Sequence, residues 1–238
     1  MKPNNPQLPN SPYVVHDGTR PQPRIVENKG AVVVAPPADA IVLFDGSNLD
    51  AWQSGNAPAA WILKDGAMVA NKSDITTKQS FGEIQLHVEW RAPAGRKVDG
   101  QSGGNSGIFF MGLYELQVLQ SHNNKTYPDG QAGALYGQLP PLVNATTTQG
   151  EWQSYDAIFT PPVYQDGKVV EPARLTVIHN GVVVQNASPY LGPTQHKTMA
   201  KYPDQHPETA PIRLQFHNDP MEFRNMWVRP LGKRDAGK

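Results

Sequence analysis

The sequence predicts an all-β protein, an antiparallel β-sandwich or jelly roll. Short segments that alternate between apolar and polar residues recur along the 238 residues, and turn signals separate them. The chain contains 23 prolines and 21 glycines, which favour turns over long helices. Apolar residues spaced three and four apart do not persist long enough for a helix. Since no repeat of fixed length occurs, a propeller is not expected.

The expected strands follow in order along the chain. A first strand at 40–44 ends in a turn, and a hairpin at 61–70 is built around Asp65-Gly66, a strong hairpin signal. A second hairpin at 174–184 is built around Asn180-Gly181. The other expected strands lie at 84–91, within 105–119 as a pair joined by a tight bend, at 155–159, at 211–217 and at 221–229.

Composition excludes several classes of protein. The 21 basic and 21 acidic residues give a formal net charge of +0, so neither a nucleic acid nor an anionic membrane surface is an expected partner. Cysteine is absent, which excludes disulfides, a thiol nucleophile and thiolate metal ligands. No apolar run approaches the length of a membrane span.

Three parts of the chain are expected. A proline-rich arm covers 1–39, a β-sandwich domain covers 40–232, and a polar tail covers 233–238. The arm is either strapped to the body by 13–15 and 31–34 or a mobile tail, and it could join copies of the chain into a homo-oligomer. The first residues lack the apolar core of a signal peptide. We expect a periplasmic or secreted protein whose leader has been removed, with a cytoplasmic protein as the alternative.

Three alternating strands are expected to present one polar surface. Because successive side chains of a strand point to opposite faces, apolar residues such as Leu86, Leu116 and Leu214 would fill the core. The opposite face would then be rich in groups that bind sugar hydroxyls and transfer protons. Its expected members are His87, Glu89, Arg91, Glu115, Gln117, Arg213, Gln215 and His217. The alternative is an ordinary solvated sheet face.

Several short segments, in this order, resemble one known family. They are 43–52 (LFDGSNLDAW), 105–108 (NSGI), 114–117 (YELQ), 133–137 (GALYG), 151–153 (EWQ), 179–181 (HNG) and 223–226 (FRNM). Together they resemble the 3-keto-disaccharide hydrolase domain family over about 41–231. The resemblance implies the concanavalin A-like lectin/glucanase fold and an enzyme that acts on glycosides already oxidised at C3.

The chemistry that this resemblance implies is an elimination. A C3 ketone acidifies the C2 proton, so a base can form an enolate that expels the C1 group, after which water adds. The route needs no pair of carboxylates, unlike ordinary glycosidases. Glucanases of the same fold carry Glu-x-Asp-x-Glu on the corresponding kind of strand, whereas this chain has Glu115-Leu116-Gln117-Val118-Leu119. A conventional glucanase is therefore the least favoured interpretation.

Glu115 is the first candidate for the catalytic acid or base, and His217 and His122 are candidate bases. A surface carboxylate paired with an arginine is the alternative for Glu115. Expected substrate-binding residues are Gln117, His87, Glu89, Arg91, Asn105, Ser106, Tyr136, Arg213, Gln215 and Arg224. A divalent cation held by Glu115 and histidines could stabilise an enediolate, but no metal-binding spacing supports it, so no cofactor is certain. A small carbohydrate is the expected partner, and the alternative function is a non-catalytic, lectin-like binding domain.

Overall fold

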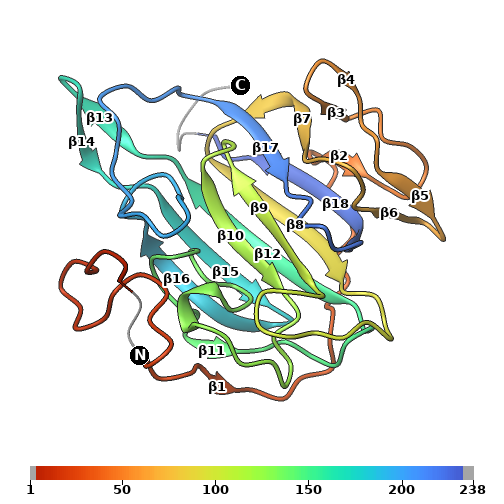
Figure 1. The fold of residues 1–238 in the computed structure, drawn as a ribbon. Coiled ribbons are helices and arrows are strands. Elements are labelled where there is room, and N and C mark those ends of the chain that lie inside the picture. Colours follow the sequence, from red (N-terminus) through yellow and green to blue (C-terminus); the bar gives the residue numbers. More distant parts are fainter. Residues whose placement is uncertain (1–3, 233–238) are drawn as a thin grey trace.

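The computed structural model describes residues 4–232, and the polar tail expected at 233–238 lies outside the described residues. Two large antiparallel sheets pack face to face, which confirms the predicted β-sandwich (Figure 1). The described residues contain no helix long and apolar enough to cross a membrane. Their only helix is a single 3-10 turn, η1 (Pro128–Gly130).

The first sheet has six strands and carries the predicted tight pair. Its order is β10 (Tyr114–Leu119), β9 (Asn105–Phe110), β17 (Ala210–Leu214), β7 (Ile75–Phe81), β3 (Trp52–Ser54) and β4 (Ala57–Pro58). The bend between β9 and β10 falls at Met111-Gly112, where both residues have positive φ, 53° and 70°. Because Phe110 pairs with Tyr114, residues 111–113 form the connection, and the two positive φ angles let the chain reverse within it.

The second sheet has eight strands. Its order is β16 (Val182–Pro189), β15 (Arg174–His179), β12 (Gln153–Thr160), β8 (Ile84–Arg91), β18 (Glu222–Pro230), β6 (Ala67–Val69) and β5 (Ile62–Lys64), with β2 (Ile41–Phe44) also paired to β18. Two small pairs lie outside these sheets, the parallel β1 (Arg24–Ile25) with β11 (Val143–Asn144), and the antiparallel β13 (Val163–Gln165) with β14 (Lys168–Glu171).

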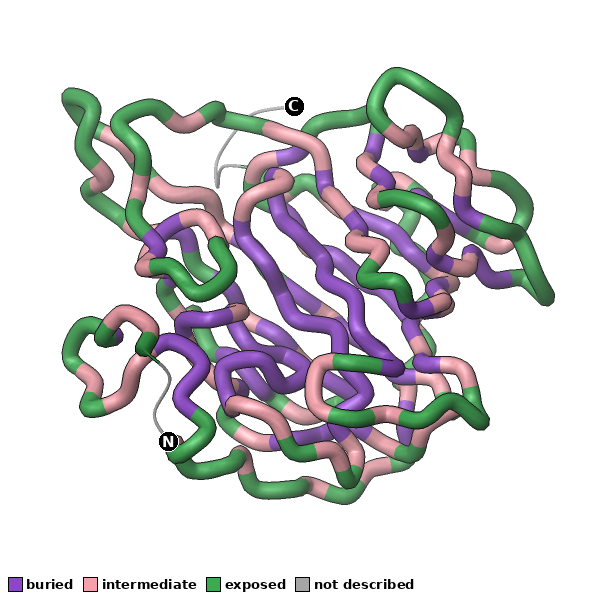
Figure 2. The backbone as a smooth tube through the Cα atoms, viewed as in Figure 1, coloured by how far each residue is buried: buried purple, intermediate pink, exposed green. Residues whose placement is uncertain are grey.

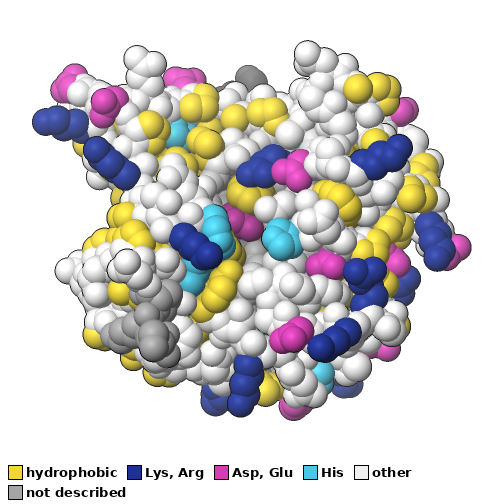
Figure 3. Space-filling view, viewed as in Figure 1, with side chains coloured by type: hydrophobic (Ala, Val, Ile, Leu, Met, Phe, Trp, Pro, Cys, Tyr) yellow, Lys and Arg dark blue, Asp and Glu magenta, His cyan; other side chains and the backbone are white. Residues whose placement is uncertain are grey.

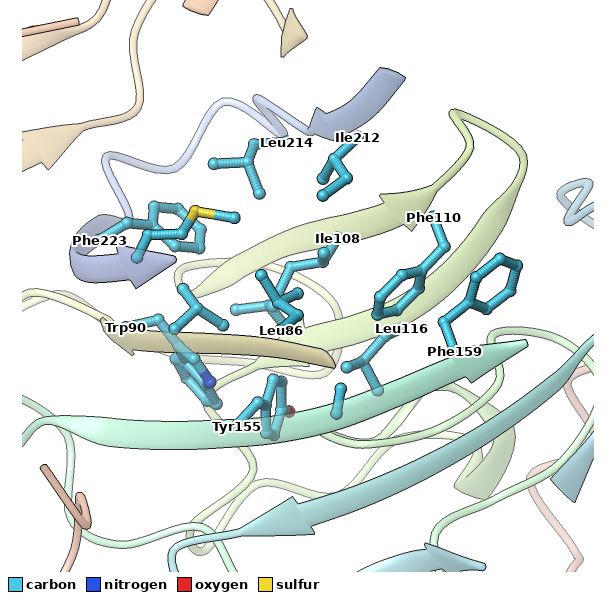
Figure 4. Close-up of a cluster of buried hydrophobic side chains, with 14 of the residues drawn as sticks. Leu86, Trp90, Ile108, Phe110, Leu116, Tyr155, Phe159, Ile212, Leu214 and Phe223 are labelled. Atoms are coloured by element: carbon cyan, nitrogen blue, oxygen red, sulfur yellow. The ribbon is translucent and has the colours of Figure 1, made fainter. Parts of the chain in front are cut away.

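The predicted inward-facing side chains form the core between the sheets. Leu86, Ile108 and Leu116 point into the space between the two layers, with Phe110 and Phe159 at one end (Figure 4). The first three are 0% exposed, and the two phenylalanine rings stack with centroids 4.8 Å apart. Strands β9 and β10 are buried along their whole length (Figure 2). This burial creates a protected site on the outside of the sheet.

Strand β8 corrects one prediction. It lies in the eight-stranded sheet, between β12 and β18, so its polar side chains point away from the face that β10 and β17 share. His87, Glu89 and Arg91 therefore do not belong to a common surface with Glu115. Alternation along one strand fixes which residues share a face of that strand, but it does not tell which sheet the strand joins.

The polar residues of β8 form a separate network on the outside of the second sheet. The His87 Nδ1 lies 2.7 Å from Asp156 Oδ1, and the Arg224 Nε donates to Glu89 Oε2 over 2.7 Å. Arg91 bonds Glu222 over 2.6 Å. These four expected substrate-binding residues, His87, Glu89, Arg91 and Arg224, are thus engaged in structural pairs.

The proline-rich arm lies along its own chain. The Val32 backbone N–H donates to Ser154 Oγ over 2.9 Å, and the Val34 carbonyl accepts from Trp227 Nε1 over 3.1 Å. The arm thus covers part of the β8 network, as a strap rather than a free tail over its described part. Whether it also joins copies of the chain stays a prediction.

Candidate active site

A cavity of about 460 Å³ opens on the outer face of the six-stranded sheet. Figure 3 shows this face hollowed near its centre, with acidic, basic and histidine side chains gathered around the hollow. The cavity is lined by Gln101, Asn105, Phe109, Glu115, Gln117, Tyr127, Tyr136, Thr194, His196, Arg213, Gln215 and His217. A concave site that combines aromatic walls with several converging polar groups suits a polyhydroxylated ligand.

Glu115 is the second residue of β10, and hydrogen bonds to its backbone fix its position. Its N–H donates to Thr194 Oγ1 over 3.0 Å, and its carbonyl accepts from the Tyr190 hydroxyl over 3.1 Å. The residue is only 4% exposed. Its carboxyl group lies over Gly107 of the neighbouring strand, where an added Cβ would come within 2.6 Å of Glu115 Oε1. Glycine at 107 therefore makes the room that the carboxyl group needs.

Burial controls the protonation of Glu115. Removal from water, opposed by the positive charge of Arg213 and assisted by nearby Asp74, raises the pKa of its carboxyl group from 4.5 to about 8. At neutral pH most molecules therefore hold Glu115 as a neutral acid. A group poised in this way can donate a proton and take one back, as general acid–base catalysis requires.

A chain of side-chain amides continues from Glu115 along the floor of the cavity. The Gln117 amide lies 3.0 Å from Gln101 Oε1 and 3.3 Å from Asn105 Oδ1. With its oxygen and nitrogen exchanged, the Gln117 amide donates to Glu115 Oε1 over 3.2 Å. Gln117 thus links the Glu115 carboxyl group to the other amides on the floor of the cavity.

Arg213 forms the cationic side of the cavity. Its Nη1 donates to Asp74 Oδ2 over 2.7 Å, and its guanidinium carbon lies 3.5 Å from the centre of the Phe109 ring. Both contacts hold the guanidinium group in place beside Glu115. A fixed cation of this kind can stabilise negative charge that develops on a substrate oxygen.

Two tyrosines and a histidine form the opposite wall. The Tyr136 hydroxyl lies 2.8 Å from the Tyr127 hydroxyl and 3.0 Å from His196 Nδ1. Burial raises the pKa of Tyr127 to about 12 and raises that of Tyr136 as well, so both remain neutral hydroxyl groups. Burial lowers the pKa of His196, and the neighbouring His16 lowers it further. The wall therefore offers neutral donors and acceptors.

Seven of the expected site residues meet around this cavity. They are Asn105, Glu115, Gln117, Tyr136, Arg213, Gln215 and His217. Gln215 and His217 follow the end of β17, where the chain leaves the sheet. Their convergence agrees with the expectation that β10 and β17 share a polar face.

Two further expectations are corrected. Ser106 points away from the cavity, because it alternates with Asn105 on β9, and its hydroxyl donates to the Gln215 carbonyl over 2.7 Å. His122 does not line the cavity; it lies in the loop after β10, where its backbone N–H bonds Gln120 Oε1. A histidine that follows a strand directly leaves the sheet with the loop, so its position in sequence does not fix its side.

Five lining residues were not expected: Gln101, Phe109, Tyr127, Thr194 and His196. Phe109 could have been found, because it shares a strand face with Asn105 and Gly107. The other four lie on loops that fold back over the sheet, and no periodic pattern places such residues.

The cation hypothesis receives no support from the side chains. Among residues 4–232, no group of three or more histidine, aspartate or glutamate side chains is arranged to hold a metal ion. The protein ligands that a metal needs for firm binding are not brought together. We assign no step to a cation.

A β-sandwich with a polar cavity and a buried acid on one sheet is an architecture of carbohydrate-active proteins. The chain matches a family model described as the 3-keto-alpha-glucoside-1,2-lyase-like domain over residues 39–229. It therefore belongs to this family, which confirms the resemblance seen in its motifs. The family places the chain among glycoside-acting hydrolases and lyases.

Solved structures agree with the fold. A Parabacteroides distasonis protein described as a candidate glycosyl hydrolase shares 43% identity over 86% of this chain and 93% of its own, with a TM-score of 0.79. Two further candidate glycosyl hydrolases from the same organism share the fold at 20% and 22% identity. They cover 82% and 81% of this chain and 94% and 99% of their own, with TM-scores of 0.57 and 0.55. No curated protein matches the sequence.

Proposed function

We propose that the protein cleaves 3-keto-glycosides in the Glu115 cavity by elimination followed by hydration. The observation that carries the proposal is a single buried acid whose pKa is raised to about 8, set among imidazoles, amides and a fixed arginine. Within residues 4–232 no second carboxyl group lines the cavity, and ordinary glycosidases need two. A ketone-activated substrate removes that need.

The proposed steps assign a task to each side of the cavity. His217 takes the C2 proton, and the electron pair forms an enolate whose oxygen at C3 lies toward Arg213. The enolate collapses to a C1–C2 double bond, the C1–O bond breaks, and Glu115 donates its proton to the leaving oxygen. Water then adds at C1 while C2 regains a proton, which yields a 3-keto sugar. The amides of Gln117 and Asn105 hold the ring hydroxyl groups.

The test is the Glu115→Gln variant, which keeps the shape of the side chain and removes its proton. Cleavage of a 3-keto-glucoside should fall by about 10²-fold or more, a typical loss for a general acid–base, while binding of the same compound by calorimetry persists. Glu222→Gln is the matched control, since Glu222 pairs with Arg91 on the other sheet, and it should retain cleavage. Wild-type protein that binds the compound without cleaving it would favour the lectin-like alternative.

A further inference from the structure

The proline-rich arm reaches the cavity wall from behind. Residues near its start close on themselves, with the Leu8 N–H donating to the Tyr13 carbonyl over 3.0 Å and the Val15 N–H to the Pro6 carbonyl over 2.9 Å. Val15 and His16 follow this small loop and are buried, with 1% and 6% of their surfaces exposed. The arm lies before the segment 39–229 that the family model matches.

His16 is anchored to the loop that carries the cavity wall. Its backbone N–H donates to Asp129 Oδ2 over 2.9 Å, and its Nδ1 lies 3.5 Å from Asp129 Oδ1. The Asp129 carbonyl in turn accepts from the Gly137 N–H over 2.8 Å, next to Tyr136. His16 has a φ of 58°, a left-handed conformation that histidine adopts more readily than most residues.

The His16 ring packs directly on the three residues of that wall. Its centroid lies 4.1 Å from that of Tyr127, 5.0 Å from that of Tyr136 and 5.3 Å from that of His196. The same three side chains are joined to one another by hydrogen bonds through the Tyr136 hydroxyl. The imidazole therefore backs a hydrogen-bonded group whose other side faces the substrate cavity.

The ring makes this contact at an energetic cost. Neither His16 ring nitrogen has a hydrogen-bond partner among the described residues, although both atoms are buried. A buried polar atom without a hydrogen-bond partner destabilises a fold, and an apolar ring would avoid this cost.

We propose that His16 is a positioning residue of the Glu115 cavity, through which the arm holds Tyr136 and His196 in place. This inference rests on the proposed function for its kinetic consequence and on the structure alone for its effect on the wall. Removal of the ring leaves a void behind Tyr127 and Tyr136, and both can retreat into it. Displacement of a site by about 1 Å can cost on the order of 10²-fold in rate.

The experiment compares His16→Asn with His16→Phe. Asparagine tolerates the left-handed backbone but removes the ring, whereas phenylalanine keeps the ring and removes its nitrogens. We expect kcat/KM for a 3-keto-glucoside to fall by about 10- to 100-fold in His16→Asn and to recover largely in His16→Phe. Leu8→Ala is the matched control, because it weakens a buried position of the arm without removing the ring. An equal loss in Leu8→Ala would assign the effect to the arm as a whole and overturn the role of His16.

A second measurement needs no substrate. The titration of the His196 imidazole can be followed by NMR, with its signal identified from a His196→Gln spectrum. The pKa of His196 is lowered by burial and by His16, so it should rise in His16→Asn as water reaches the wall. An unchanged titration overturns the proposal. Absence of 3-keto-glycoside cleavage by the wild type overturns the proposed function instead, so the two failures are distinct.

Discussion

Replacement of Glu115 by glutamine should stabilise the protein, and increasingly so as pH rises. Folding raises the pKa of this carboxyl group from 4.5 to about 8. Between these values the folded protein retains a proton that the unfolded chain has released. The free energy of unfolding therefore falls with increasing pH across this window, because the folded protein binds more protons than the unfolded chain. Glutamine has no proton to lose, so the variant escapes this loss.

The magnitude follows from the size of the shift. Each pKa unit corresponds to about 1.4 kcal/mol, so the shift from 4.5 to about 8 corresponds to about 5 kcal/mol at pH above 8. At pH 7, about 2.5 units above 4.5, the destabilisation from this one group is about 3 kcal/mol, and at pH 5 it is below about 1 kcal/mol. The residue is 4% exposed, so little solvent screening reduces these values.

The assay is urea unfolding of the wild type and of Glu115→Gln at pH 5, 7 and 8.5, with the difference in free energy of unfolding as the readout. Taking the difference between the two proteins cancels the titration of all groups that both share. The advantage of the variant should grow by about 2–3 kcal/mol between pH 5 and pH 7. A difference that stays constant over this range would refute the argument, since it would mean that Glu115 ionises in the folded protein as it does in water.

Two further predictions concern the residues around each carboxylate. In Gly107→Ala the new Cβ would come within 2.6 Å of Glu115 Oε1 and 2.9 Å of Phe109, so kcat/KM for a 3-keto-glucoside should fall at least about tenfold, measured beside a thermal melt that reports the overpacking cost of about 1–3 kcal/mol. On the opposite sheet, Glu89→Gln should lower the free energy of unfolding at pH 7 by roughly 1–3 kcal/mol and leave cleavage unchanged. Burial alone would raise the pKa of Glu89, but its contacts with His87, Asn225 and Arg224 lower it below 4.5, so its contribution is present above pH 4.5 and is lost as pH falls through the lowered value. Unfolding curves of the variant and the wild type should therefore converge in acid, and a gap that persists there would contradict this account.

The sequence predicts local features well and global pairing poorly. The turns at Asp65-Gly66 and Asn180-Gly181 lie where the sequence places them, because their φ preferences are local properties. Strand β7 was not expected, because its central residues 76–80 are polar and its partners β17 and β3 are distant in sequence. The hairpin of β13 and β14 was missed although Asp166-Gly167 marks its turn. Its strands are too short and too exposed to show an alternating pattern.

The same distinction between local pattern and long-range packing applies to the residues of the site. Glu115 and Gln117 are placed by alternation within β10. Arg213 lies on β17, beyond β9 in the same sheet, and Gln215 directly follows β17, so the floor of the cavity could be predicted from the sequence. His196 and Thr194 reach the cavity on a loop between β16 and β17, whose path depends on packing rather than on any period. The position of His16 could not be predicted at all, because no pattern in a proline-rich arm indicates where the arm packs on the domain.

Glu89 and Glu115 show what distinguishes a structural from a functional carboxylate when both stand in alternating strands and both are buried. Glu89 accepts hydrogen bonds from Arg224 and Asn225 over 2.7 and 2.8 Å, and these contacts lower its pKa despite burial. Glu115 is equally withdrawn from water, yet burial outweighs the opposing charge of Arg213, and its pKa rises to about 8. The first arrangement stabilises a charge and holds two strands and the arm together, while the second stores a proton at an energetic cost. This contrast supports the proposal that the reaction takes place at the unpaired acid Glu115 and not at the paired Glu89.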